Sequence, residues 1–295
     1  MCEPTELLKL NLNDIQYTLE DSNSFCMTNL VNKKAIVTGG LNGLGKKVAE
    51  TLLKHDAKVT IFDIAEKSWP DVRLEWSKTF SQDSFNFIRC DVCNRLETIS
   101  AFEKAITHFN GLDIVINNAG IVDEGNWEKC VDINLTAMIR VAYIGINLMS
   151  KANGKNGGVI INSASMAGLT TFGYPVYCAT KHALTAFTRS IASIPGFLDM
   201  HGVRVNSVCL GFSQTDIVKP QDFKQTGELD GFPSIDHVNK IKDKVLDELK
   251  FEDMIPVDKA ASLYFQIIND SKVHGRNLFY NSIKQKKPYY HEHKF

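Results

Sequence analysis

The sequence lacks an excess of charge of either sign, and it lacks any long uncharged apolar run. Lys and Arg total 33 against 34 Asp and Glu, which leaves a net charge of −1 over 295 residues. So small a net charge does not favour nucleic acid or an anionic membrane surface as the main partner. Hydrophobic residues make up 44% of the chain, enough for a substantial core. No apolar run has the length of a bilayer-spanning helix, so we expect no integral membrane association.

The first thirty residues lack the apolar core of a secretory signal and carry repeated charges instead. Cysteines number seven, an odd count, and both features favour a reducing cytoplasm. Cys90 and Cys93 have redox-motif spacing, but no second pair accompanies them. His291 and His293 could hold a metal, although a solvated tail is the commoner reason for such residues. We predict no metal site.

Short apolar runs alternate with helical patterns through most of the chain. The runs lie near residues 34–38, 58–63, 85–91, 113–117, 158–163, 203–209 and 276–280. Alternation of this kind predicts an α/β fold with a doubly wound parallel sheet. We expect a single Rossmann domain over residues 33–295 and an N-terminal extension over residues 1–32, whose role the sequence does not indicate.

A glycine-rich turn follows the first predicted strand. The segment from Thr38 to Gly45 has glycines at 39, 43 and 45 and leads into the helical pattern KKVAETLLKH. Glycine permits positive φ and close approach of a ligand, and the following helix presents free N–H groups and the positive end of its dipole. The segment could be an ordinary loop, but it favours a pyrophosphate as its occupant.

The second predicted strand ends in a carboxylate, Asp63. It follows the glycine turn by about twenty residues, the position at which dinucleotide-binding folds bind the adenosine ribose. A 2′-phosphate would be repelled there, and Leu41, Asn42 and Ile64 supply no cation to bind one. The sequence therefore predicts NAD over NADP.

Tyr177 and Lys181 are four residues apart, so they lie on one face of a helix. The lysine ammonium would lower the pKa of the phenol and make it a better general base. Ser165 ends a predicted buried strand and could hold a substrate oxygen beside the phenol. Spacing alone is a weak indication, because Tyr280 and Lys284 repeat it without a strand-end serine.

In order and spacing, these motifs resemble the short-chain dehydrogenase/reductase family in its compact form. The resemblance covers most of the chain and includes Asp91, Asn117–Gly120 and Asn134; the segment Val205–Thr215 also matches, with Leu210 in place of the usual proline. The stretches over residues 134–150, 156–169 and 175–190 are similar to insect members of the 15-hydroxyprostaglandin dehydrogenase-like and alcohol dehydrogenase-like groups. A seven-stranded sheet is what the resemblance implies.

The resemblance also implies four catalytic residues. Asn134 would position a water, Ser165 would orient the substrate oxygen, and Tyr177 would act as the general base. Lys181 would lower the tyrosine pKa and bind the nicotinamide ribose. A buried polar residue that satisfies helix backbone would explain Asn134 equally well. The implied cofactor contacts are Gly39, Leu41, Asn42, Gly43, Leu44, Gly45, Asp63, Asp91, Val92, Asn118, Ala119, Gly120, Tyr177, Lys181, Gly211 and Thr215.

Residues 213–251 resemble the lid that covers the substrate in this family. Besides Ser165 and Tyr177, we expect Phe172 and Tyr174 to contact the substrate, and they favour an apolar or secondary alcohol over a sugar. Simple packing beneath the lid would explain these two aromatic residues equally well. The family usually assembles through its long helices, so the resemblance implies a homodimer or a homotetramer.

The sequence thus predicts an NAD-dependent enzyme that interconverts an alcohol and its carbonyl by hydride transfer. A carbonyl reductase working in the reverse direction would use the same residues and stays open. A nonenzymatic NAD-binding regulatory protein is the other alternative. It would tolerate losses at Ser165, Tyr177 or Lys181, yet all three are present.

Overall fold

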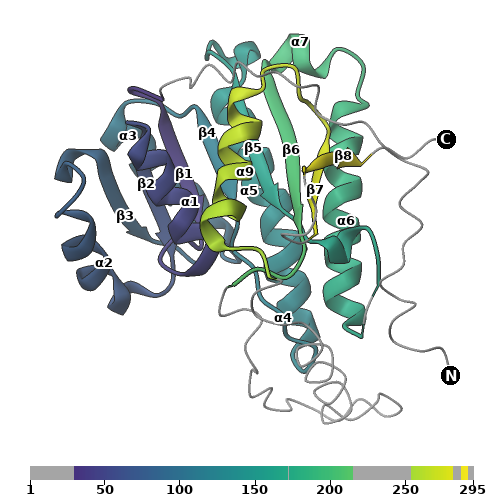
Figure 1. The fold of residues 1–295 in the computed structure, drawn as a ribbon. Coiled ribbons are helices and arrows are strands. Elements are labelled where there is room, and N and C mark those ends of the chain that lie inside the picture. The colour runs from purple at the N-terminus through teal and green to yellow at the C-terminus, as the bar shows by residue number, and fades with distance from the viewer. Residues whose placement is uncertain (1–29, 172, 215–253, 282–286, 292–295) are drawn as a thin grey trace, which may run out of the picture.

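The computed structural model describes residues 30–171, 173–214, 254–281 and 287–291. These residues form one eight-stranded sheet in the order β3-β2-β1-β4-β5-β6-β7-β8 (Figure 1). The strands are β1 (Lys34–Thr38), β2 (Lys58–Asp63), β3 (Phe85–Arg89), β4 (Ile114–Asn117), β5 (Gly158–Ser163), β6 (Val203–Leu210), β7 (Asn277–Tyr280) and β8 (Tyr289–His291). All neighbours pair in parallel except β7 and β8. The strand order reverses between β1 and β4, the position at which such sheets bind ligands.

Helices cover both faces of the sheet. One face carries α1 (Gly43–Lys54), α2 (Trp69–Trp76) and α9 (Val257–Asn269), and the other carries α3 (Arg95–Phe109), α5 (Met138–Met149) and α6 (Pro175–Ala192). Shorter elements complete the described chain: α4 (Trp127–Val131), α7 (Phe197–His201), η2 (Glu66–Ser68), η3 (Gln82–Ser84), η5 (Lys151–Asn153), η6 (Met166–Gly168) and the π-helical η4 (Asp132–Ala137).

The central strands are buried on both faces. Val37 and Ile116 belong to the core on the α1 and α9 side, whereas Ile36 and Val115 belong to the core on the α3 and α5 side. This two-sided burial explains why these strands are continuous apolar runs and do not alternate with polar residues. Each fully buried aliphatic side chain stabilises the fold by about 2 kcal/mol, so the middle of the sheet is a firm base for the loops that follow it.

The seven strands expected from the sequence are all present and parallel, and their ends agree with the prediction within two residues. An eighth strand, β8, adds an antiparallel edge beside β7. The prediction missed it because three residues are too few to show a period of two. Most of the N-terminal extension and of the expected lid, residues 1–29 and 215–253, lies outside the described residues.

Within the described part of the chain, one helical stretch, Trp127–Met149, is long and apolar enough to cross a bilayer. The stretch runs through α4, η4 and α5. Val141, Ala142 and Met149 from α5 are buried in the core against the sheet. Core helices of soluble proteins meet the same criteria of length and composition, so this stretch is weak support for a membrane span.

Candidate active site

The predicted site residues follow the carboxyl ends of the parallel strands and therefore gather at one edge of the sheet. In order of the strands β1 to β6, they are Gly39, Asp63, Asp91, Asn118, Ser165 and Gly211. Tyr177 and Lys181 reach the same region from the first two turns of α6. The fold thus brings together residues that the sequence separates by more than a hundred positions.

Ser165, Tyr177 and Lys181 converge as the sequence predicts. The Lys181 Nζ atom lies 5.5 Å from the centroid of the Tyr177 ring. The phenol hydrogen-bonds with the side chain of Ser165. Lys181 Nζ also donates to the carbonyl oxygen of Ser163, the last residue of β5, at 2.8 Å. The helix and the strand are therefore joined by the lysine itself.

Burial dominates the ionisation of this group. It raises the pKa of Tyr177 to about 12, and the hydrogen bond with Ser165 opposes that rise. Burial also lowers the pKa of Lys181 to about 8. The net pKa of Tyr177 is raised because desolvation of the phenol outweighs the contribution that lowers it. The effect expected of Lys181 on that pKa stays a prediction. At neutral pH Tyr177 is therefore protonated.

Asn134 is fully buried in the π-helical turn η4. Its Nδ2 donates to the Ile121 carbonyl oxygen at 2.7 Å, and its Oδ1 accepts from the Ile121 N–H at 2.9 Å. The side chain thus satisfies backbone hydrogen-bonding groups of the loop after β4. This agrees with the alternative explanation of Asn134 as a buried polar residue that binds backbone. A Cβ at Gly120 would lie 3.2 Å from Asn134 Oδ1 and 3.6 Å from Lys181 Nζ. Asn134 therefore lies near Lys181, one of the predicted catalytic residues, in a kind of helical turn that often marks functional sites.

The glycine turn has the conformation that its sequence predicts. Gly39 and Gly43 have φ values of 63° and 51°, where glycine is favoured. A Cβ at Gly45 would overlap the carbonyl oxygen of Gly39. The side chain of Asn42 makes no capping bond at the start of α1, so backbone N–H groups remain for an anion. The turn therefore fits the pyrophosphate of a dinucleotide.

Asn118 and Thr38 hold the glycine turn against β4. Asn118 Nδ2 donates to the carbonyl oxygens of Thr38 and Gly39, both at 3.1 Å. Thr38 Oγ1 in turn accepts from the backbone N–H groups of Asn118 and Ala119, at 2.9 and 3.0 Å. These reciprocal bonds clamp the ends of two neighbouring strands together.

Asp63 stands at the end of β2, where the sequence places the ribose-binding carboxylate. One oxygen accepts from the backbone N–H of Leu41 at 3.0 Å, and the other accepts from the N–H of Ala65 at 2.9 Å. Asp63 thereby links the glycine turn to its own loop. A carboxylate has about four acceptor sites, so the oxygens retain capacity for two ribose hydroxyls.

Asp91 and Val92 shape the loop after β3. Asp91 Oδ1 accepts from the backbone N–H of Cys93 at 2.9 Å. The Val92 carbonyl oxygen accepts from Arg140 Nη1 at 2.7 Å, which ties this loop to α5. Both residues therefore stand on the nucleotide side of the sheet, on a loop fixed by side chains.

Leu44, Gly211 and Tyr174 are the remaining predicted residues that the structure describes. Leu44 is the second residue of α1 and packs against the core on that side of the sheet. Gly211 N–H donates to the Tyr280 carbonyl oxygen at 2.8 Å, which anchors the loop after β6 to β7. Tyr174 immediately precedes α6 and is buried in an apolar cluster with Tyr177. Phe172 and Thr215 lie outside the described residues.

Three residues of the site were missed by the sequence reasoning. Ser163 Oγ donates to Asn118 Oδ1 at 3.2 Å and bonds with the Tyr264 hydroxyl of α9 at 2.8 Å. Glu124 accepts a hydrogen bond from the Tyr177 backbone N–H at 2.9 Å. Ser163 could have been suspected from its place at the strand end. The other two carry no local signal, because their contacts join distant segments.

The cysteine pair has none of the features of a reactive site. Cys90 and Cys93 are both free, and burial raises the pKa of each thiol to about 11. A thiol with so high a pKa is a poor nucleophile at neutral pH. Over the residues that the structure describes, no group of three or more His, Cys, Asp and Glu side chains could hold a metal ion.

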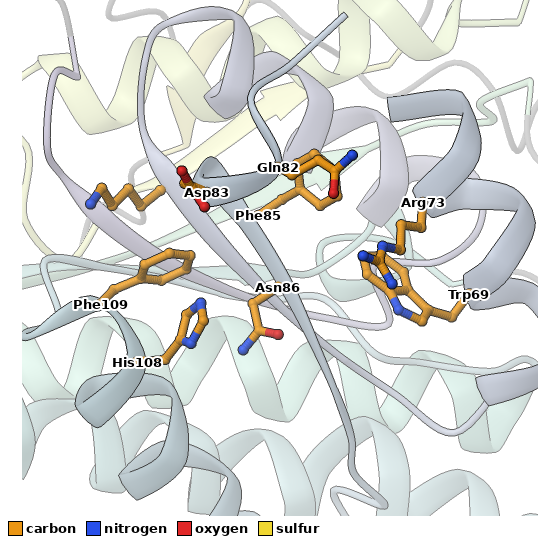
Figure 2. A pocket seen from close by; sticks show the side chains of 9 residues that line it. Trp69, Arg73, Gln82, Asp83, Phe85, Asn86, His108 and Phe109 are labelled. Carbon is orange, nitrogen blue, oxygen red and sulfur yellow. The ribbon is translucent and has the colours of Figure 1, made fainter. Parts of the chain in front are cut away.

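A separate groove of about 550 Å³ lies along the edge strand β3, away from the carboxyl ends of the strands (Figure 2). Its walls come from the first residues of β2 and β3 and from α2, η3 and α3. They are formed by Lys58, Trp69, Arg73, Gln82, Asp83, Phe85, Asn86, His108 and Phe109. None of the predicted site residues lines it. The groove therefore has no part in the chemistry argued from Ser165 and Tyr177.

Comparisons with known proteins agree with this arrangement. The model of the short chain dehydrogenase family matches residues 33–226. Mouse 15-hydroxyprostaglandin dehydrogenase [NAD(+)] is 36% identical over 244 residues, which cover 82% of this chain and 87% of that protein. A 3-alpha-(or 20-beta)-hydroxysteroid dehydrogenase of Mycobacterium bovis is 32% identical over 209 residues, 67% of this chain and 76% of that protein.

The fold also matches a solved structure. The crystal structure of a short-chain type dehydrogenase/reductase from Mycobacterium marinum superposes with a TM-score of 0.72. The match covers 86% of this chain and 95% of that one at 24% sequence identity. At this identity the likeness supports the fold and nothing finer.

Proposed function

We infer, from the premise that the chain belongs to the short-chain dehydrogenase family, that it uses NAD to interconvert an apolar or secondary alcohol and its carbonyl. Membership of this family makes the protein an enzyme that acts on alcohols and carbonyls. The observation that carries the finer proposal is the convergence of Ser165, Tyr177 and Lys181 at the carboxyl edge of the sheet.

The proposed roles follow from the positions of the side chains. Ser165 and Tyr177 are hydrogen-bonded to each other, so a substrate oxygen beside them can bind both hydroxyls. In oxidation Tyr177 takes the proton of the alcohol, and in reduction it gives a proton to the carbonyl oxygen. Bound NAD supplies the acceptor for the hydride. Lys181 holds Ser163 and adds positive charge near the phenol, and Asn134 fixes the loop beside them.

NAD is the proposed cofactor for two reasons. The glycine turn leaves room for a pyrophosphate, and the Asp63 carboxylate stands where a 2′-phosphate would be repelled. The related 15-hydroxyprostaglandin dehydrogenases from mouse and human also carry NAD(+) in their names. We propose that the adenosine side of the cofactor lies against Asp63, Asp91 and Val92.

An apolar alcohol is supported by the cluster around the phenol. Ala167, Tyr174, Tyr177, Cys130 and Cys178 form a buried apolar group, with Val122 and Val176 packed against it. The similar proteins are named for a hydroxyprostaglandin and for hydroxysteroids. The reverse direction, reduction of a carbonyl, has one specific observation in its favour: Tyr177, with its pKa raised to about 12, holds its proton at neutral pH.

The wider setting is also proposed. We assign residues 33–295 to one domain. The substrate lid expected from the resemblance, residues 213–251, lies mostly outside the described residues. We place the protein in the cytoplasm, because the five cysteines described are all free. A homodimer or homotetramer is proposed through the long helices, where Tyr143 on α5 is 55% exposed and packs edge-on against Phe187 of α6.

The rise in absorbance as NADH forms tests the proposal. Purified wild type and Tyr177→Phe would be assayed with primary, secondary, terpenoid and steroid alcohols and with polyols, using NAD and NADP separately. We expect turnover of apolar alcohols with NAD, and a loss of about a thousandfold in Tyr177→Phe because the proton acceptor is removed.

Binding of NAD by Tyr177→Phe, measured by fluorescence titration, is the control for folding. Turnover of polyols alone would sink the proposed substrate class. Preference for NADP would contradict the assignment of Asp63. NAD binding without any turnover would favour the nonenzymatic alternative.

A further inference from the structure

The carboxylate of Glu124 is the side chain that holds the first turn of the catalytic helix. Glu124 lies in the loop between β4 and α4 and is 8% exposed. Its Oε2 accepts from the Val176 N–H at 3.1 Å, and its Oε1 accepts from the Tyr177 N–H at 2.9 Å. Both oxygens thus bind consecutive backbone groups of α6, one of which belongs to the proposed proton-transfer residue.

The first N–H groups of α6 need a hydrogen-bond acceptor from another segment of the chain. The residue before the helix, Tyr174, makes no capping bond with its side chain, and the first helical residue is Pro175. The N–H groups at the second and third helical positions have no acceptor within the helix. These are the groups on Val176 and Tyr177 that Glu124 binds. A negative charge is also favoured at the positive end of the helix dipole.

Glu124 is buried, which disfavours the ionised form of its carboxyl group. Burial raises the pKa of Glu124, the two backbone N–H groups oppose that rise, and the neighbouring Asp123 adds to it. Asp123 itself accepts from the Asn126 N–H at 2.9 Å. Burial of a carboxylate costs several kcal/mol unless hydrogen bonds compensate. A residue that served only to fill this space would be apolar.

The loop that carries Glu124 touches each part of the site. Its first residue, Asn118, holds the glycine turn through Gly39. Ile121 is bound by Asn134 on both its backbone groups. Glu124 then binds α6 at Tyr177. Ser165 lies two residues beyond the end of β5 and not at the strand end that the sequence predicts. The position of the phenol relative to Ser165 therefore depends on the loop that carries Glu124.

We propose that Glu124 is a positioning residue that fixes Tyr177 in the geometry needed for proton transfer, acting through the two N–H groups at the start of α6. This proposal rests on the proposed function of Tyr177. Without the carboxylate, the first turn of α6 is free to shift, and the phenol loses its alignment with Ser165. Displacement of a reacting group by about 1 Å is enough to cost about a hundredfold in rate.

Two measurements on Glu124→Gln test the proposal. The amide keeps the shape but replaces one acceptor oxygen with a donor that faces an N–H group. We expect kcat to fall about 10- to 100-fold, with the KM for NAD and the unfolding midpoint near those of wild type. In NAD-free protein, hydrogen–deuterium exchange of the peptide covering residues 174–180 should become faster.

Glu128→Gln is the matched control, since it removes a carboxylate from an exposed side chain of α4. It should leave kcat and the exchange of residues 174–180 unchanged. Wild-type kcat and exchange in Glu124→Gln would overturn the proposal. So would a parallel loss of activity, NAD binding and thermal stability, which would indicate a general folding role.

The exchange measurement separates this proposal from the proposed function. If wild type turned over no alcohol, the proposed function would fail, because no rate would exist to compare. Exchange at residues 174–180 would still report on the anchor. Unchanged exchange would overturn the positioning role, and faster exchange with wild-type stability would support it.

Discussion

The nucleotide half of the site and the proton-transfer half are built in different ways. Around β1, β2 and β4, side chains such as Asp63 and Asn118 bind backbone, so the ligand is left with N–H groups and a shaped turn. Around β5 and α6, the groups proposed to face the substrate are side chains, and burial shifts the pKa of Tyr177 and Lys181.

This difference separates affinity from rate. Backbone shape governs how well a cofactor binds, so substitutions in the nucleotide half should change the Kd for NAD and leave kcat at saturation nearly unchanged. Ionisable side chains govern the chemical step, so substitutions in the proton-transfer half should change kcat. Four experiments test this separation.

Lys181→Met should give the largest effect. The substitution keeps an apolar stem but removes the charge near the phenol and the bond to the Ser163 carbonyl. We expect kcat to fall about 100- to 1,000-fold. Steady-state rates at saturating NAD measure this change. Lys104→Met, on an exposed position of α3, should keep the wild-type rate. A rise in KM alone would mean that Lys181 contributes only binding.

Gly45→Ala should give the next largest effect, and it should change the Kd for NAD instead of kcat. The added Cβ would overlap the Gly39 carbonyl oxygen and press on Asn118. Overpacking of this kind costs about 1–3 kcal/mol, which corresponds to a Kd for NAD about 5- to 150-fold weaker. Fluorescence titration with NAD measures it. Gly154→Ala meets no atom within 4 Å but has a φ of 71°, so it is the control for backbone strain away from the site. An unchanged Kd with a reduced kcat would contradict the separation of affinity from rate.

The rates of oxidation and reduction should depend differently on pH. Because burial raises the pKa of Tyr177 to about 12, the phenolate that oxidation needs is scarce at neutral pH. The rate of oxidation should rise by about tenfold per pH unit below that pKa, then flatten above about 8 as Lys181 loses its proton. Reduction needs the phenol and should not rise. Initial rates of both reactions across pH 6 to about 9 test this, and a flat oxidation profile would contradict it.

Tyr264→Phe should give the smallest effect. The substitution removes the bond between the Tyr264 hydroxyl and Ser163, which in turn binds Asn118. One hydrogen bond contributes about 0.5–1.5 kcal/mol, so the Kd for NAD should weaken about 2- to 10-fold. NAD titration of this variant beside Tyr143→Phe, whose ring is 55% exposed, is the comparison. A large fall in kcat instead would place Tyr264 in the proton-transfer half.

The sequence predicts the parts of the fold that have a local cause. The parallel strands are apolar runs with helical patterns between them, and the glycine turn needs positive φ at Gly39 and Gly43. The spacing of Tyr177 and Lys181 places both on one helix face. In each case a few neighbouring residues determine the structure, so reading along the chain is sufficient.

The missed features depend on contacts between distant segments. Glu124 binds a residue 53 positions away, and Ser163 binds one 101 positions away. Burial of Tyr177, which raises its pKa, likewise depends on everything packed around it. One signal for Glu124 was available: a helix that begins at Pro175 without a capping residue needs an acceptor from elsewhere.

The backbone and the side chain of Ser163 contact different halves of the site. Its carbonyl oxygen binds the Lys181 ammonium, while its hydroxyl bonds with the Asn118 amide that supports the cofactor turn. Ser163 therefore contacts both Lys181 and the side chain that holds the glycine turn. By reciprocity, if protonation of Lys181 alters the affinity for NAD, then NAD alters the proton affinity of Lys181 by the same factor. In that case the change in NAD affinity with pH and the change in the Lys181 pKa on NAD binding report the same coupling free energy.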